Sequence, residues 1–163
     1  MVPAYTTAEE IKEISPDGIM LSNGPGDPTE NTEIIENIKE ISRLGIPIFG
    51  ICLGHQLMAL AHGGRTEKLK YGHRGANQPV VDKTLDRTFV TSQNHGYAVI
   101  GDSIDPNIAE VSHFNANDGT CEGMRYKNIN AFTVQFHPEA HGGPQDTEYL
   151  FDEFIEIIKK EMR

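Results

Sequence analysis

Cys52 lies at the centre of a Gly-x-Cys-x-Gly stretch, with Gly50 and Gly54 two positions away on either side. Residues 46–50 are largely apolar and predict a buried strand, whereas 56–61 are strong helix formers. A thiol on a tight strand-to-helix turn is typical of a nucleophile elbow, with cysteine in the place of serine. The glycines permit a strained backbone that exposes the side chain, and the helix start favours the thiolate. A buried, inert cysteine is the other interpretation, and the stretch alone does not decide between them.

A cysteine nucleophile needs a base and a group that orients the base. His137 follows the predicted strand 131–136 and precedes Pro138 and Glu139. Ligands bind at the carboxyl ends of strands in parallel α/β sheets, and Pro138 holds the preceding residue in an extended or turn conformation. Glu139 would then lie beside the imidazole and fix its tautomer. A strand-end histidine with a solvated glutamate has the same spacing, so both interpretations stay open at this point.

Backbone amides are the candidate donors for an oxyanion. The N–H of Leu53, directly after the cysteine, is one of them. The loop 23–28 holds two glycines and two prolines after a predicted strand, so Gly24 or Gly26 can bring a second N–H close. No Gly-Lys-Ser/Thr follows this loop, which argues against a phosphate-binding loop.

Other polar residues carry weaker signals. Residues 92–97 offer amide and hydroxyl groups that could contact a small polar ligand, or they could be an ordinary turn, and residues 72–75 with 77–79 are similar. No group of His, Cys and Asp residues has the spacing of a metal site along the chain, so we expect no metal.

The scaffold is predicted from periodicity and turn residues. Helices are expected over residues 8–14, 32–44, 54–62 and from 147 onward. Strands are expected over residues 18–22, 46–51, 65–70, 78–82, 88–93, 108–114, 120–126 and 131–136. The expected N-caps are Thr7, with Glu10 completing a capping box, then Thr32, and Asp146 or Thr147. This pattern predicts the α/β class, with an open, mostly parallel sheet flanked by helices and a smaller antiparallel segment, in one domain over 1–163.

Composition narrows the function classes. The chain has 24 acidic and 14 basic residues and a formal net charge of −10, which argues against a nucleic-acid partner. No apolar run is long enough to cross a bilayer and no secretory signal is visible, so we expect no membrane partner. The two cysteines, Cys52 and Cys121, fit a reducing cytoplasm.

Three motifs in order resemble those of the class I (triad) glutamine amidotransferases, a family with a flavodoxin-like sheet. The stretch 50–56 resembles that family's nucleophile elbow, 22–28 its oxyanion loop, and 137–139 its His-x-Glu pair. Such a combination is far more specific than any single motif. Segments similar to the branch that forms the small, glutamine-hydrolysing subunit of carbamoyl-phosphate synthetase are 69–80, 92–98 and 137–144.

The resemblance implies a reaction. Cys52 would attack the carboxamide carbon of glutamine, and His137, oriented by Glu139, would take the thiol proton and deliver it to ammonia. The N–H groups of Gly24 and Leu53 would hold the oxyanion before water hydrolyses the γ-glutamyl thioester. The residues implied in glutamine binding are Gly24, Gly26, Leu53, Gln56, Asn94, Gly96 and Tyr97.

The resemblance also implies a partner. A large synthetase subunit would join the ammonia to bicarbonate, with ATP and magnesium bound there and no cofactor in this chain. Triad glutaminases of anthranilate or GMP synthesis and γ-glutamyl hydrolases share the motifs, so they remain alternatives.

The start of the chain departs from the family pattern. The resemblance implies a further strand and helix, and an N-terminal domain contributing a serine, ahead of residue 1. Residues 1–5 would then be the end of a strand, and the chain would be a truncated fragment. A fragment that keeps the fold without turnover, serving as an interaction domain, is the alternative from another class.

Overall fold

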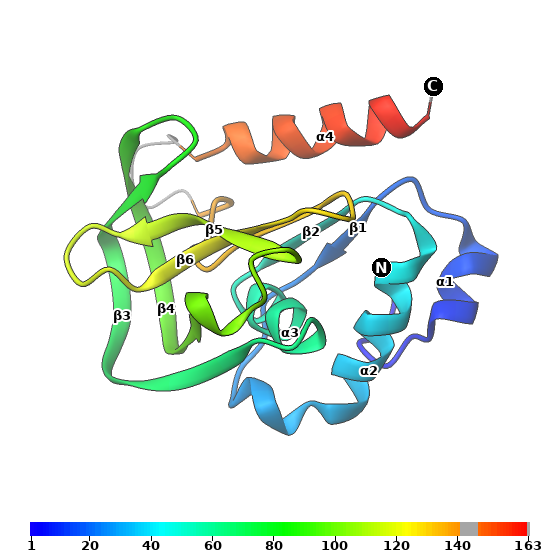
Figure 1. The fold of residues 1–163 in the computed structure, drawn as a ribbon, viewed down its shortest axis with the longest axis horizontal. Helices are drawn as coiled ribbons and strands as arrows, with labels where there is room; N and C mark the ends of the chain where they lie inside the picture. The colour runs from blue at the N-terminus through cyan, green and yellow to red at the C-terminus, as the bar shows by residue number, and fades with distance from the viewer. Residues whose placement is uncertain (141–146, 163) are drawn as a thin grey trace.

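The computed structural model describes residues 1–140 and 147–162 (Figure 1). Within them, seven strands form one sheet in the order β1-β2-β7-β6-β5-β3-β4. The strands are β1 (Ile19–Leu21), β2 (Ile48–Ile51), β3 (Arg65–Asp82), β4 (Arg87–Ile100), β5 (Ala109–Asn115), β6 (Cys121–Tyr126) and β7 (Ala131–Val134). The helices are α1 (Ala8–Ile14), α2 (Thr32–Ile41), α3 (Leu53–Ala61) and α4 (Tyr149–Glu161). None of these helices is long and apolar enough to cross a membrane.

The predicted α/β class, with an open sheet flanked by helices, is confirmed. The balance of strand directions differs from the expectation: β1, β2 and β7 pair in parallel, whereas the other four pairings are antiparallel. The antiparallel part is therefore the larger one, and it continues the parallel part in a single sheet. The two parts are continuous because β7 pairs with β2 in parallel on one side and with β6 in antiparallel on the other.

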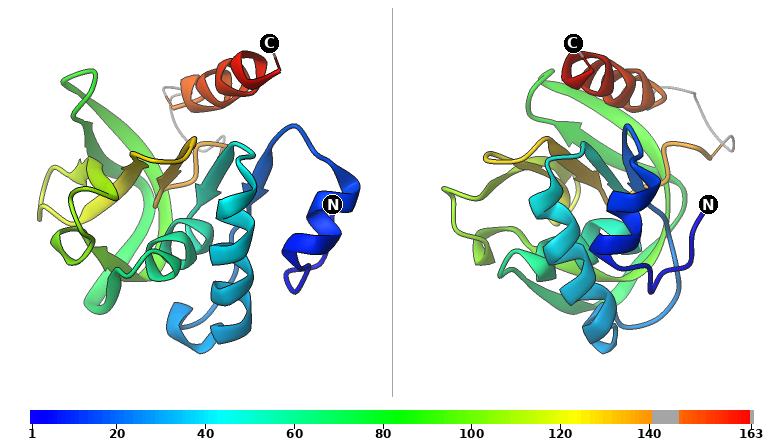
Figure 2. Two further views of the ribbon diagram at one scale, coloured as in Figure 1. Left: turned by 45° about the vertical axis from the view of Figure 1, so that its right-hand side comes forward. Right: turned by 90° about the vertical axis from the view of Figure 1, so that its right-hand side faces the viewer.

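Helices cover both faces of the sheet (Figures 1 and 2). Neighbouring residues of β2 point to opposite sides, as the pleat requires. Ile48 belongs to the core under α2 and α3, whereas Phe49 belongs to the core under α4. Phe49 stacks on Phe132 with ring centroids 4.5 Å apart and contacts Phe154 of α4 at 5.7 Å. The central strands are thus buried on both faces, and their carboxyl ends open toward the site.

The predicted strands in the middle of the chain merge into two long ones. Residues 65–70 and 78–82 both lie in β3, and 88–93 extends to the end of β4. The β3–β4 pairing shifts register twice, beside Gly72 (φ +71°) and Gly75 (φ +112°). An ordinary turn was one of the two interpretations of this segment, but its glycines form irregularities that bend a continuous strand.

Three predictions about chain ends and caps are resolved. Thr7 caps α1 as expected, since Glu10 N–H donates to Thr7 Oγ1 at 3.3 Å. Thr32 is the first residue of α2 and Asn31 is its N-cap, so that prediction was one residue late. Thr147 lies one position before the N-cap of α4, and Asp146 lies outside the described residues.

The interpretation of residues 1–5 as the end of a strand was wrong. Residues 1–6 form no strand, and Thr6 bonds the carbonyl of Pro3 through both its N–H (3.1 Å) and its hydroxyl (2.6 Å). This local turn uses the donors that a strand would give to a neighbour.

Candidate active site

Cys52 sits on the turn between β2 and α3, with φ +53° and ψ −104°. A non-glycine residue with positive φ is strained, and such strain is stored at functional sites. The flanking glycines contribute space. A Cβ on Gly54 would lie 2.2 Å from the carbonyl oxygen of Leu21, and one on Gly50 would lie 2.9 Å from Thr133 Cγ2. The elbow therefore needs both glycines because neighbouring strands approach closely, while the unusual torsion angles belong to the cysteine itself.

Hydrogen bonds hold this conformation from two sides. Cys52 N–H donates to the carbonyl of Val134 at 2.9 Å, and Gln56 N–H donates to the carbonyl of Cys52 at 3.2 Å. The thiol itself receives a hydrogen bond, since Gln135 Nε2 lies 3.4 Å from Cys52 Sγ. Gln135 in turn accepts a hydrogen bond from Gln56 Nε2 at 2.9 Å. The sulfur thus lies among donors that would stabilise a negative charge.

His137 and Glu139 come together as the sequence predicted. His137 Nδ1 donates to Glu139 Oε1 at 2.8 Å, and His137 N–H is fixed by the carbonyl of Ser92 at 2.9 Å. Hydrogen bonding to Cys52, followed by that to Glu139, raises the pKa of His137 to about 10 against the opposing effect of burial. Burial raises the pKa of Glu139, but the hydrogen bond from His137, a backbone hydrogen bond and the charge of His137 together outweigh it and leave the pKa below its usual value. The two side chains therefore form a hydrogen-bonded pair close to the sulfur.

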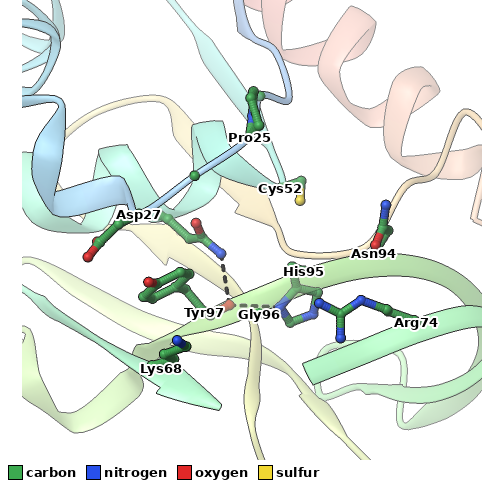
Figure 3. A pocket seen from close by; sticks show the side chains of 12 residues that line it. Pro25, Asp27, Cys52, Lys68, Arg74, Asn94, His95, Gly96 and Tyr97 are labelled. Carbon is green, nitrogen blue, oxygen red and sulfur yellow. Dashed lines mark hydrogen bonds between the residues drawn. The ribbon is translucent and has the colours of Figure 1, made fainter. Parts of the chain in front are cut away.

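A cavity of about 420 Å³ opens beside the cysteine (Figure 3). One wall is the loop after β1, and the opposite wall is the polar segment of β4. The described residues that line it are Gly24, Pro25, Gly26, Asp27, Cys52, Gln56, Lys68, Arg74, Asn94, His95, Gly96 and Tyr97. All the predicted glutamine-binding residues except Leu53 are therefore gathered around one hollow. Leu53 begins α3 and meets the loop, because a Cβ on Gly24 would lie 2.8 Å from Leu53 Cδ2.

Several residues of the site were not predicted. Gln135 reaches the thiol, and its only sequence signal is an amide within an apolar strand. Lys68 and Arg74 add positive charge to the cavity, and Asp27 adds negative charge. His95 lies in the cavity wall and donates through Nδ1 to the carbonyl of Tyr97 at 2.7 Å. Its segment was singled out as polar, but no spacing marked this side chain.

Comparison with models of known families shows to which family the chain belongs. The family model for glutamine amidotransferase class-I matches residues 1–157. The chain belongs to this family. The assignment agrees with the motifs at 22–28, 50–56 and 137–139, which the fold brings to one side of the sheet.

Named relatives within the family are small chains of carbamoyl phosphate synthase. The protein of that name from Bacillus cereus is 56% identical over 160 residues, covering 98% of this chain and 43% of the relative. The one from Fusobacterium nucleatum is 55% identical over 163 residues, covering 100% of this chain and 45% of the relative. The chain thus spans less than half the length of the curated relatives that it matches.

Solved structures share the family's fold. The structure described as a putative GMP synthase subunit from Thermoplasma acidophilum superimposes with a TM-score of 0.84 at 23% identity, covering 99% of this chain and 81% of that one. A glutamine amidotransferase from Thermotoga maritima gives a TM-score of 0.60 at 20% identity, with coverage of 88% and 65%. At these identities the likeness concerns the fold alone.

Proposed function

We propose that this chain is the glutamine-hydrolysing part of a carbamoyl-phosphate synthetase, and that residues 1–163 form one catalytic domain. The observation that carries the proposal is that Cys52 borders a small polar cavity, while His137 pairs with Glu139 at 2.8 Å and has its pKa raised by Cys52 and Glu139. The 56% identity to small chains of that synthetase selects the branch of the family.

The geometry supports a thioester mechanism. Cys52 Sγ attacks the side-chain carboxamide carbon of glutamine, and the thiol proton passes to His137 Nε2, since Nδ1 is bonded to Glu139. The negative oxygen of the tetrahedral intermediate is held by the N–H groups of Leu53 and Gly24. His137 then protonates the departing ammonia, and water cleaves the γ-glutamyl thioester to give glutamate.

The cavity suits an amino acid with two charges. Lys68 and Arg74 provide positive charge for a carboxylate, and Asp27 provides negative charge for an ammonium group. Gln56 is held by Tyr97 and cannot swing away, since its Nε2 donates to the Tyr97 carbonyl at 2.9 Å. Asn94 and Gly96 complete the opposite wall, as expected for residues that hold the amino-acid end of glutamine.

The partner in this proposal is a large synthetase subunit that takes up the ammonia. ATP and magnesium are expected on that subunit, and no cofactor is expected on this chain. The location is expected to be cytoplasmic. The motifs also suit a glutaminase that serves another acceptor or releases glutamate alone, and the partner requirement distinguishes these alternatives.

Glutamate release from glutamine, measured with and without a purified large synthetase subunit, tests the proposal. Glutamine-dependent carbamoyl phosphate should form with the subunit and be lost in Cys52→Ala. Formation of anthranilate with a chorismate-using partner instead would overturn the assignment to this branch.

Labelling by a glutamine-like electrophile separates a working nucleophile from a domain that only binds. Mass spectrometry should find the label on Cys52 and not on Cys121. Cys121 is the internal control, because burial raises the pKa of its thiol to about 12. Equal labelling of the two cysteines would support the interaction domain.

A further inference from the structure

A second group of polar side chains lies beneath the cavity wall. His73 of β3 and His95 of β4 are opposite each other in the antiparallel pairing, with ring centroids 5.1 Å apart. Glu122 of β6 reaches them from across the sheet. One ligand atom from each of these three buried residues lies within 4.8 Å of the other two. Sequence spacing indicated no metal site, because these ligands come from three strands.

Two atoms of this group have no hydrogen-bond partner among the described residues. Glu122 is fully buried, and its Oε2 accepts no hydrogen bond. His73 Nδ1 lies 3.3 Å from Glu122 Oε1 but forms no hydrogen bond. A buried carboxylate oxygen without a partner is costly, so such an atom calls for an occupant.

In each of the two histidines, one ring nitrogen already donates a hydrogen bond to an oxygen outside the group. His73 Nε2 donates to Asp118 Oδ2 at 2.7 Å, and His95 Nδ1 donates to the Tyr97 carbonyl at 2.7 Å. The ligand atoms that remain are His73 Nδ1, which faces Glu122 Oε1 at 3.3 Å, and His95 Nε2, which faces Gln93 Oε1 at 2.8 Å. Metal-binding histidines almost always donate their second ring N–H to a carboxylate or a backbone carbonyl in this way.

An amide oxygen, that of Gln93, also faces this group of side chains. Gln93 Nε2 donates to Thr91 Oγ1 at 3.1 Å, so Gln93 Oε1 faces His95 Nε2 at 2.8 Å. In a neutral ring with its proton on Nδ1, these are two acceptors with no proton between them. A cation at this point would satisfy both.

We propose that His73, His95 and Glu122 bind a divalent transition metal of the Zn²⁺ type. Two imidazole nitrogens and one carboxylate oxygen suit this ion, with a fourth position left for water or the Gln93 amide. The 3.3 Å between His73 Nδ1 and Glu122 Oε1 already matches ligands about 3.4 Å apart around a tetrahedral ion. The three ligand atoms lie within 4.8 Å of one another, so His95 has to move inward to reach the same ion. The charges of Glu122 and Asp118 together balance the ion.

Zinc titration by calorimetry tests the site. The experiment uses the full chain with Cys52→Ala in every sample, so that the thiol beside His137 does not compete. One Zn²⁺ per chain is expected to bind, and Glu122→Gln should weaken binding by more than about 100-fold. Asp118→Asn, which changes only the residue behind His73, should weaken it about 10- to 100-fold. His62→Gln is the matched control and should bind like the parent.

Cobalt gives an independent readout. Co²⁺ in a four-coordinate site of nitrogen and oxygen ligands should produce visible absorption bands without a thiolate charge-transfer band. Absence of stoichiometric Zn²⁺ binding, or equal affinity in Glu122→Gln, would overturn the proposal. If circular dichroism shows that Glu122→Gln does not fold, Asp118→Asn is the deciding variant, because the Asp118 side chain is half exposed. Unchanged Zn²⁺ affinity in Asp118→Asn would then refute the site.

Discussion

Gln135 Nε2 donates a hydrogen bond to Cys52 Sγ across 3.4 Å, although 83 positions separate the two residues in the chain. The same segment supplies the carbonyl of Val134 that receives the Cys52 N–H. The end of β7 therefore fixes both the backbone and the sulfur of the elbow. His137, two residues after Gln135, brings the proposed base to the same place.

Replacing Gln135 by leucine should slow glutamate release about 10- to 100-fold. A hydrogen bond to a charged group contributes about 1.5–3 kcal/mol, and the leucine cannot donate to the sulfur. The steady-state rate at saturating glutamine measures the effect. Gln78→Leu is the control, since among the described residues the Gln78 side-chain amide bonds only the Arg74 carbonyl within β3. Equal rates in the two variants would show that Gln135 does not act on the thiol.

His137→Asn should lower glutamate release about 10²- to 10⁴-fold, the range lost when a positioned general base is removed. Glu139→Gln should have a smaller effect, because it removes the orienting charge and leaves the imidazole. Turnover in His137→Asn close to that of the parent would refute the assignment of the base.

Gly54→Ala should destabilise the fold by about 3 kcal/mol or more, because its Cβ would lie 2.2 Å from backbone atoms of Leu21 that cannot rotate away. Gly119→Ala is the comparison. Gly119 has φ +74° with open space around it, so only the backbone strain of about 1–2 kcal/mol applies. Urea unfolding measures both, and equal losses would contradict the close approach at the elbow.

Asp82 links the β3–β4 turn to α4, and its contribution to stability should be lost in acid. The buried carboxylate accepts hydrogen bonds from Tyr149 Oη at 2.5 Å and Thr84 N–H at 2.8 Å, and His113 Nε2 lies 3.3 Å away. Burial raises the pKa of Asp82, but the bonds from His113 and Tyr149 outweigh it and hold the pKa well below the usual 3.8. A lowered folded-state pKa gives stability that is present above the unfolded value and lost as the pH falls below it.

Asp82→Asn should therefore reduce the free energy of unfolding by about 2 kcal/mol at pH 7. The difference from the parent should shrink as the pH falls below 3.8. Urea titrations at pH 7 and in acid measure it, with the exposed Asp17→Asn as the control. A difference that stays constant in acid would contradict the depressed pKa.

The parts of the site that the sequence predicted are local. Cys52, Leu53 and their glycines form one turn, and His137 and Glu139 are two residues apart, so spacing was enough to place each motif. The helices followed from capping residues and apolar periodicity. The order of the motifs along the chain then indicated the family.

The parts that escaped prediction join distant segments. Gln135 contacts the thiol only because β7 pairs with β2, and no local sequence pattern predicts which strands pair. Likewise, His73 faces His95 only after β3 continues through its two glycine irregularities instead of turning back. Polar residues on a bent strand were interpreted as loops, because composition does not distinguish a bulge from a turn.

The dependence of Cys52 on Val134 also concerns the order in which the chain is made. The strained cysteine conformation costs about 1–3 kcal/mol and persists only where its surroundings hold it. Its partner strand is synthesised about eighty residues later. During translation the thiol is therefore an ordinary cysteine on an unfinished sheet, and it can act as the proposed nucleophile only after the segment that also carries the proposed base has left the ribosome.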